Sequence, residues 1–303
     1  MKIAVTGATG FVGRYLVQHL LSSGHQLQCW CRPSSDLSGF PDAPELLKWI
    51  PGALGEAEAS QQLVAECDAV IHAALWRPGE QFRGGEGDLL RFAETNVLGT
   101  LRLIEAARHH DVPRFVFIST CAVHEVIMDD RLLDESHPLW PTSHYGAHKA
   151  AIEKFVHSYG LGEGYDICSL RPTGVYGLRK PADQSKWFKL IHDVACGTSV
   201  HCSRGGKEVH AADVARAAEL LVHAEGIAGQ SYNCYDQYIS QWDVAQLAKE
   251  ISGSTAVIEG EQTTPRNEIE NQKLKQLGMQ FGGETRLQQT VKEILEASTP
   301  STD

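Results

Sequence analysis

The chain has 303 residues, and its 27 Lys and Arg against 38 Asp and Glu give a formal net charge of −11. This length suffices for one large or two modest domains whose core needs no disulfide or metal. A content of 42% hydrophobic and 21% charged residues is typical of a globular protein and argues against disorder. Because an acidic chain is repelled by nucleic acids and anionic lipids, neither is an expected partner.

No apolar run approaches the roughly 20 residues that span a bilayer, and residues 1–7 lack the apolar stretch of a secretory signal. We therefore expect a cytoplasmic protein whose eight cysteines, which include no C-x-x-C pair, are reduced. His144 and His148 are four residues apart, a spacing that metal ligands use, but no third ligand has a matching spacing. No metal site is predicted, and both histidines are expected to border a substrate cleft.

The predicted elements alternate between strand and helix along the first part of the chain. Strands are predicted at residues 2–6, 26–31, 46–50, 68–72, 114–119 and 165–170, with helices at 11–23, 56–66, 89–109 and 145–159. Because the strands are almost continuously apolar, this pattern predicts an α/β fold with a doubly wound parallel sheet. The remaining chain is predicted to form a helix at 213–225, a strand at 231–235, and helices near 241–251 and 285–297.

A glycine-rich turn follows the first strand and opens the first helix, with Gly7, Gly10 and Gly13 at its three key positions. In such a turn the first glycine permits the tight bend and the second lets the backbone approach a pyrophosphate. The third allows close packing of the helix on the strand. Phosphates then lie on the amides of the helix N-terminus. The turn therefore predicts a dinucleotide site, with three further members: Thr9, Phe11 and Val12.

These patterns predict two domains. A Rossmann domain comprises residues 1–171 and about 208–230, and a smaller, discontinuous C-terminal lobe that binds substrate comprises about 172–207 and 231–303. The boundary is placed where strand–helix alternation gives way to a segment rich in Gly, Pro, Lys and Arg.

The end of the second strand distinguishes the two nicotinamide cofactors. NAD favours an acidic residue about 20 residues beyond the glycines, but here Arg32 follows the strand and no acid precedes Asp36. The guanidinium of Arg32 can pair with a 2′-phosphate, which favours NADP over NAD. The alternative is that Arg32 only stacks on adenine, which is compatible with either cofactor.

Tyr145 and Lys149 are four residues apart and share one face of a predicted helix. A tyrosine that exchanges a proton near neutral pH needs a lowered pKa, which a nearby lysine charge provides. Ser119 and Thr120, at the end of a strand, supply hydroxyls that can bond a reacting oxygen. Because tyrosine and lysine often occur at this spacing, the pair alone is also compatible with a solvated helix face.

In this order, the glycine turn, Thr120 and the Tyr145-x-x-x-Lys149 pair resemble the short-chain dehydrogenase/reductase superfamily. The length and the C-terminal segment are similar to its extended branch, the nucleotide-sugar epimerase/dehydratase type. Further matching segments are residues 70–74, 96–100, 171–177, 210–215 and 271–278. The resemblance covers nearly the whole chain.

The resemblance implies a role for each matching residue. Tyr145 would be the general acid/base, Lys149 would hold the nicotinamide ribose, and Thr120 would orient the substrate oxygen. Asn96 would support either a proton-relay water or the geometry of its helix. The nicotinamide side of the cofactor would be lined by Ala73, Ala74, Pro172 and Val175. A homodimer that packs through a pair of helices is also implied.

The sequence departs from the family pattern at two places. Gly52-Ala53-Leu54 stands where the family has Gly-Asp near adenine, so Leu54 is expected in a rebuilt adenine contact. Residues 123–125, Val-His-Glu, replace the family's Val-Tyr-Gly after the catalytic hydroxyl. Pro172-Thr173 and the ending of the second strand are closer to the carbonyl reductases of the branch.

Two further groups of residues fit a substrate site or ordinary structure equally well. A basic run could hold a substrate anion or form a solvated face; it comprises Arg179, Lys180, Lys186 and Lys189. Three loop tryptophans could line an apolar pocket or simply pack; they are Trp76, Trp140 and Trp187.

The expected function is that of an NAD(P)-dependent oxidoreductase that transfers hydride on a small carbonyl or alcohol substrate, with Tyr145 as acid/base. One alternative is a nucleotide-sugar epimerase or dehydratase with tightly bound NAD(P), where the hydride returns to the same substrate. A third is a non-catalytic NAD(P)-sensing protein, which the complete Thr120, Tyr145 and Lys149 set argues against.

Overall fold

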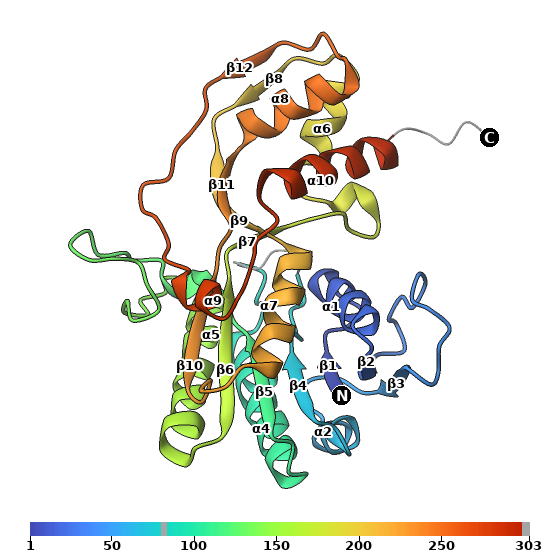
Figure 1. Cartoon of the computed structure of the whole chain (residues 1–303), viewed down its shortest axis with the longest axis vertical. Helices are drawn as coiled ribbons and strands as arrows, with labels where there is room; N and C mark the ends of the chain where they lie inside the picture. The colour runs from blue at the N-terminus through green and yellow to red at the C-terminus, as the bar shows by residue number, and fades with distance from the viewer. Residues whose placement is uncertain (80–83, 299–303) are drawn as a thin grey trace. The chain divides into compact units, whose positions relative to one another are not determined.

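The computed structural model describes residues 1–79 and 84–298 (Figure 1). The chain divides into two compact units. The first comprises Met1–Pro172, Val214–Cys234 and Ile269–Met279. The second comprises Thr173–Asp213, Tyr235–Glu268 and Gln280–Asp303.

The first unit is built on one seven-stranded sheet. Its strands are β1 (Lys2–Thr6), β2 (Gln26–Cys31), β3 (Leu47–Pro51), β4 (Ala69–His72), β5 (Arg114–Ile118), β6 (Asp166–Pro172) and β10 (Gln230–Cys234). The strand order is β10-β6-β5-β4-β1-β2-β3, and every neighbouring pair is parallel. The order reverses between β1 and β4, and ligands of doubly wound sheets bind at the carboxyl ends of the strands at such a point. The predicted fold class is confirmed.

The helices of this unit fill the connections between its strands. They are α1 (Phe11–Ser22), α2 (Ala57–Val64), α3 (Leu89–Ala93), α4 (Gly99–His109), α5 (His144–His157), α7 (Ala211–His223, whose first residues belong to the second unit) and α9 (Gln272–Gln276). Side chains from α2, α4 and α5 pack on the strands around Trp30, Leu63, Ile104, Phe115 and Phe117. Full burial of each such side chain contributes about 1.5–3 kcal/mol. None of the described helices has both the length and the apolar character to cross a membrane.

One predicted helix differs from the structure. Residues 89–109 form α3 and α4 with a π-helical segment, Glu94–Leu98, between them. The side-chain amide of Asn96 donates to the carbonyl of Phe92, and the Thr100 hydroxyl donates to the carbonyl of Asn96. Both bonds occupy backbone carbonyls that otherwise accept hydrogen bonds from helix amides, and the helix is wider at this segment. Helix propensity alone does not predict this π-helical segment.

The second unit has its own core. Two small sheets comprise β7 (Gly174–Tyr176), β9 (Gly205–His210) and β11 (Gln237–Ser240), and β8 (Val200–Cys202) with β12 (Ile258–Gly260). The helices are α6 (Phe188–Ala195), α8 (Gln241–Ser252) and α10 (Gly283–Ser298), which bury residues such as Ile191, Val244, Leu287 and Val291. The helices near 241–251 and 285–297 were predicted. The strands β7, β8, β9, β11 and β12 and the helix α6 were not.

The division between the units differs from the predicted ranges by more than one residue at three places. Residues 231–234, predicted in the lobe, lie in β10, which pairs with β6 in the first unit. Residues 208–213, predicted in the Rossmann domain, group with the second unit because β9 pairs with β7 and β11. Residues 269–279 join the first unit, where Ile269 bridges to Leu133.

Candidate active site

The glycine-rich turn joins β1 to α1 as predicted, and its geometry demands glycine. Gly7 has φ +71°, and a Cβ there would lie 2.8 Å from the backbone of Ala73 and Ala74. A Cβ at Gly13 would lie 1.9 Å from the carbonyl oxygen of Gly7. Gly10 is exposed at the N-cap of α1, and no side chain among the described residues caps it. The uncapped amides fit the phosphates of a dinucleotide.

A chain of buried hydrogen bonds fixes the end of β4 beside this turn. Thr6 Oγ1 accepts from the amides of residues 73 and 74 at 3.1 Å, so its hydroxyl donates to His72 Nδ1 at 2.6 Å. Thr100 Oγ1 donates to the Asn96 carbonyl at 2.6 Å and therefore accepts from His72 Nε2 at 2.8 Å. Burial lowers the pKa of His72 to about 3, so the ring is neutral with its hydrogen on Nε2. Each hydrogen in the chain thus has one assigned acceptor.

The loop after β2 is tied to the glycine turn. The amide of Arg32 donates to Ser35 Oγ at 2.9 Å, and Thr9 Oγ1 donates to the same oxygen at 3.5 Å. The side chain of Arg32 is exposed. A second cation lies in this loop and was not predicted from the sequence. Arg14 of α1 reaches the loop and pairs with Asp36 at 3.0 Å. The charge of Arg14 is therefore already balanced.

The other predicted cofactor residues occupy different surroundings. Leu54 is partly buried against the core and lies beside Gly99, where a Cβ would come within 3.2 Å of Leu54 Cγ. Phe11 and Val12 are partly buried in the first turn of α1. Pro172 is the buried last residue of β6. Val175 lies in β7 of the second unit, so its role beside the cofactor stays a prediction.

Thr120 and Tyr145 lie on segments that pack directly against each other. Thr120 follows β5, and its Oγ1 accepts from the amide of Ala122 at 3.1 Å. A Cβ at Gly146 would lie 2.6 Å from the Ala122 carbonyl oxygen, so α5 can begin this close to the turn only with glycine at 146. The structure therefore brings the predicted hydroxyl and the predicted phenol to the same end of β5.

Lys149 is buried, and its ammonium reaches back to the end of β5. Its Nζ donates to the carbonyl of Ile118 at 2.8 Å and lies 4.5 Å from the centroid of the Phe117 ring. Burial lowers the pKa of Lys149 to about 7, although the nearby Glu153 carboxylate opposes that shift. Lys149 thus changes charge near neutral pH, unlike a lysine on a solvated helix face.

Sequence reasoning missed a buried ion pair below these residues. Glu153 and Arg171 are 0% and 1% exposed, with Arg171 Nε 3.0 Å from both carboxylate oxygens of Glu153. Ser119 Oγ donates to Glu153 at 2.5 Å. Because this bond engages Ser119, Thr120 is the better candidate to contact substrate. The sequence held one signal for this pair. Successive four-residue spacings place Tyr145, Lys149 and Glu153 on one face of α5.

Residues 123–125, where the sequence departs from the family pattern, have a structural role through Glu125. Glu125 accepts hydrogen bonds from the amides and the hydroxyls of both Thr142 and Ser143. Burial alone would raise the pKa of Glu125, but these hydrogen bonds outweigh it and hold the pKa below its usual value. Ser143 in turn caps α5 by accepting from the amide of Gly146. Glu125 therefore fixes the start of the helix that carries Tyr145.

Asn96 contacts backbone rather than a solvent path. It is 2% exposed, its Oδ1 accepts from the amide of Trp76 at 2.8 Å, and its Nδ2 donates to the carbonyls of Trp76 and Phe92. Of the two roles that the resemblance implied, these contacts favour support of the helix geometry. We therefore treat Asn96 as a positioning residue.

The two histidines of α5 differ from the sequence expectation. His144 is exposed, but His148 is buried, and its ring lies 5.3 Å from that of Tyr145 and 4.9 Å from that of Phe92 between centroids. Burial lowers the pKa of His148 to about 3. His148 is therefore a neutral packing residue beside Tyr145, and the prediction that it borders a cleft is wrong.

Two lysines of the basic run and one of the three tryptophans are engaged within the second unit, whereas Trp140 is exposed. Lys186 pairs with Glu208, and Lys189 pairs with Asp193 at 2.6 Å. These contacts favour a structural role for the run over an anion site. Trp187 packs on Tyr176 in the core of the second unit.

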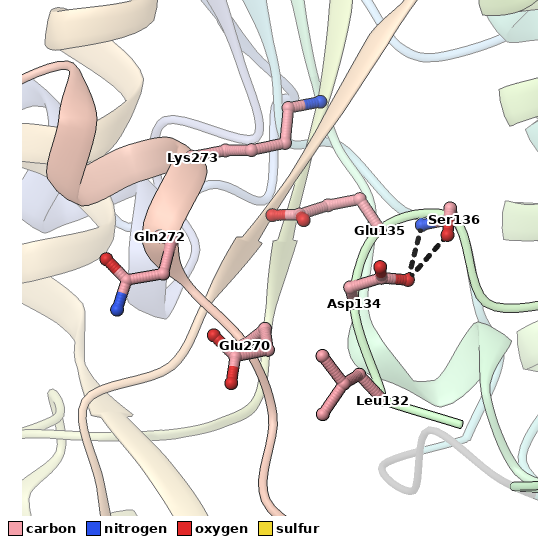
Figure 2. Close-up of a pocket in the computed structure, with 7 residues that line it drawn as sticks. All are labelled: Leu132, Asp134, Glu135, Ser136, Glu270, Gln272 and Lys273. Carbon is pink, nitrogen blue, oxygen red and sulfur yellow. Dashed lines mark hydrogen bonds between the residues drawn. The ribbon is translucent and has the colours of Figure 1, made fainter. Parts of the chain in front are cut away.

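A pocket of roughly 360 Å³ opens in the first unit, away from the predicted residues. Its lining is shown in Figure 2 and comprises Leu132, Asp134, Glu135, Ser136, Glu270, Gln272 and Lys273. The single ammonium, that of Lys273, already donates to the carbonyl of Ser231 at 2.8 Å and to Gln230 Oε1 at 2.9 Å. With three carboxylates in its lining, this pocket does not suit a phosphate.

Comparisons with known proteins agree with the fold. Residues 3–234 match the NAD dependent epimerase/dehydratase family. The chain belongs to this family. It is therefore an NAD(P)-dependent enzyme of the extended short-chain dehydrogenase/reductase type, which confirms the resemblance seen in the sequence.

Individual relatives have different activities. The chain is 32% identical over 186 residues to a dTDP-glucose 4,6-dehydratase of Streptomyces antibioticus, covering 58% of this chain and 54% of that protein. It is 31% identical over 202 residues to a 3-beta-hydroxysteroid dehydrogenase of Mycolicibacterium neoaurum, covering 65% and 52%. The structure of a UDP-glucose 4-epimerase from Thermotoga maritima matches with a TM-score of 0.80 at 21% identity, covering 99% of this chain and 100% of that one. At that identity the match shows the fold alone.

The buried ion pair gives a stability prediction. Arg171→Met leaves the Glu153 carboxylate buried without its partner, which should lower the free energy of unfolding by about 3–5 kcal/mol. Adding Glu153→Gln removes the stranded charge and should restore part of that loss. Urea unfolding of the three proteins measures both effects.

Arg131→Met is the matched control, because its pair with Asp134 is 36% exposed on each side. Exposed pairs contribute at most about 1 kcal/mol. If Arg171→Met costs no more than Arg131→Met, the buried pair does not support the site.

Proposed function

We propose that this enzyme interconverts an alcohol and a carbonyl by hydride transfer with net redox, and that Tyr145 is its general acid/base. The observation that supports the proposal is the buried Lys149, which α5 holds four residues from Tyr145 at the carboxyl end of β5. Thr120 lies at that same strand end, beside the start of α5. A solvated helix face would not bury its lysine.

Each residue has a defined part in the reaction. When bound, a nicotinamide cofactor supplies or accepts the hydride. Because Thr120 Oγ1 accepts from the Ala122 amide, its hydroxyl hydrogen can be donated to the substrate oxygen. Tyr145 gives that oxygen a proton during reduction and takes it back during oxidation. Lys149 binds the nicotinamide ribose, and its ammonium form supplies positive charge beside the phenol.

The surroundings of Thr120 favour simple redox chemistry over elimination of water. Dehydration needs an acid for the leaving hydroxide and a base for the carbon-bound proton. Residues 120–125 contain one carboxylate, Glu125, whose oxygens accept four hydrogen bonds from Thr142 and Ser143. Glu125 is thus committed to holding α5.

The second candidate is a nucleotide-sugar epimerase or dehydratase that keeps its cofactor bound. The family match and the similarity to the dTDP-glucose 4,6-dehydratase favour it. The pairing of Lys186 and Lys189 with acids argues against it, since a sugar nucleotide brings a diphosphate to be neutralised. Consumption of many equivalents of NAD(P)H per chain would support net redox, and conversion with no net change in cofactor would support the second candidate.

A homodimer also belongs to this proposal. Large apolar side chains are exposed on two helical segments of the first unit. Leu90 and Leu98 lie on α3 and its π segment, and Phe155 and Leu161 lie on α5 and the π-helical segment Ser158–Gly162 that follows it. Such residues suit helix pairing between two copies. Sedimentation velocity detects the dimer directly.

The proposed cofactor is NADP. Arg32 is exposed at the end of β2, while the charge of Arg14 in the same loop is balanced by Asp36. Arg32→Ala should therefore reduce the preference for NADPH over NADH by about 1.5–3 kcal/mol, the contribution of a hydrogen bond to a charged group. Fluorescence titration of both cofactors gives the affinity ratio, in which general effects of the substitution cancel. Equal affinities of the parent protein for NADPH and NADH would rule out the assignment.

The acid/base assignment predicts a specific kinetic loss. Tyr145→Phe keeps the ring and removes the transferable proton, so turnover should fall about 10²–10⁴-fold while cofactor affinity stays nearly unchanged. Single-turnover absorbance of NAD(P)H with an active carbonyl substrate measures the rate. Tyr159→Phe, on the helical segment that follows α5, is the matched control and should leave the rate unaltered. Parent-like turnover by Tyr145→Phe would refute the mechanism.

A further inference from the structure

Three histidines surround one carboxylate in the first unit, near the amino end of β2, whereas the glycine turn follows the carboxyl end of its parallel neighbour β1. His19 lies near the end of α1, and His25 directly precedes β2. Glu219 and His223 are four residues apart on α7, which Figure 1 shows beside α1. Residues at this spacing share one helix face and can bind one ion together. Neither the expected function nor the family assigns any role to this group.

The side chains already converge. Glu219 Oε1 lies 2.9 Å from His25 Nε2, and Oε2 lies 2.6 Å from His19 Nε2. The rings of His25 and His223 are stacked, with centroids 5.6 Å apart. His25, Glu219 and His223 each offer one ligand atom, and these atoms lie within 4.8 Å of one another.

We propose that His25, Glu219 and His223 form a binding site for a divalent transition-metal ion, Zn²⁺ in particular. Two imidazoles and a carboxylate are a donor set that Zn²⁺ uses, whereas Mg²⁺ and Ca²⁺ select oxygen ligands. A water completes the fourth position. His19 bonds the second oxygen of Glu219 and orients that carboxylate, as outer residues of metal sites commonly do.

The required movement is small. At zinc–ligand distances near 2.0–2.1 Å, tetrahedral ligand atoms lie about 3.3 Å apart. The His25–Glu219 separation of 2.9 Å must open slightly, and the span of 4.8 Å must close. His223 is exposed, so its side chain can turn toward the other two.

The hydrogen bonds of the cluster do not use all of its polar atoms. His25 is buried, and its Nε2, which faces Glu219, is the atom that would bind the ion. One carboxylate also cannot pair fully with three imidazoles. Within the cluster, His223 stacks on the ring of His25, and an ion would in addition bind a ring nitrogen of His223.

The ion would cross-link α7 to the α1–β2 connection, which are about 200 residues apart in the chain. Along α1 the site lies about 14 Å from Gly10, since a helix rises 1.5 Å per residue. The site is therefore structural, and its occupancy is independent of the proposed redox chemistry.

The test uses the full chain without a histidine tag, stripped with a chelator and titrated with ZnCl₂ against a chromophoric zinc indicator. One Zn²⁺ should bind per chain, and His223→Ala and Glu219→Gln should each weaken binding at least 10-fold. His109→Ala, an exposed histidine on α4, is the matched control and should bind like the parent. Co²⁺ in place of Zn²⁺ should give the intense visible absorption of a tetrahedral site.

Thermal unfolding distinguishes a cluster that binds metal from one that is only hydrogen-bonded. Zn²⁺ should raise the unfolding midpoint of the parent and of His109→Ala but not that of His223→Ala. Because His223 is exposed, this variant should fold normally without metal. Absence of one-to-one binding, or binding that the His223 and Glu219 substitutions leave unchanged, would overturn the site and leave only a hydrogen-bonded contact between helices.

Discussion

The candidate active site depends on one fully buried carboxylate, that of Glu153. It neutralises Arg171, accepts the Ser119 hydroxyl and opposes the effect of burial on Lys149. Burying an ion costs several kcal/mol unless it is paired and fully hydrogen-bonded, and these contacts meet that condition. They connect α5, β5 and β6, so the elements that carry Thr120 and Tyr145 are joined through a single side chain.

The opposite side of the site is built from neutral groups. Thr6, His72 and Thr100 form a hydrogen-bond chain in which every hydrogen has an acceptor, and burial keeps the pKa of His72 near 3. This chain holds the glycine turn against the end of β4 with uncharged side chains. The exposed Arg32 and the ammonium form of Lys149 supply the positive charge at the positions that the proposal assigns to the 2′-phosphate and the ribose.

The sequence alone predicted the features that local patterns encode. The apolar strands, the three turn glycines and the Tyr145–Lys149 spacing are all local. The Glu153–Arg171 pair and the contact of Arg14 with Asp36 join residues 18 and 22 positions apart in different elements, so only the fold brings them together. The short strands of the second unit escaped prediction because segments such as β7 have three residues and begin with glycine, too few for an alternating pattern. His148 was misplaced because periodicity does not show what a helix face packs against.

The most direct test of this account is the ionisation of Lys149. Lysine ε-carbons can be labelled with ¹³C and followed by NMR as the pH changes, with the Lys149 signal assigned by its absence from Lys149→Arg. We expect a pKa of about 7 for Lys149 in the cofactor-free protein, because burial disfavours the ammonium, and a still lower value in Glu153→Gln. Titration near 10.5, the value of an ordinary lysine, would contradict the buried position of Lys149 on which the proposed site depends.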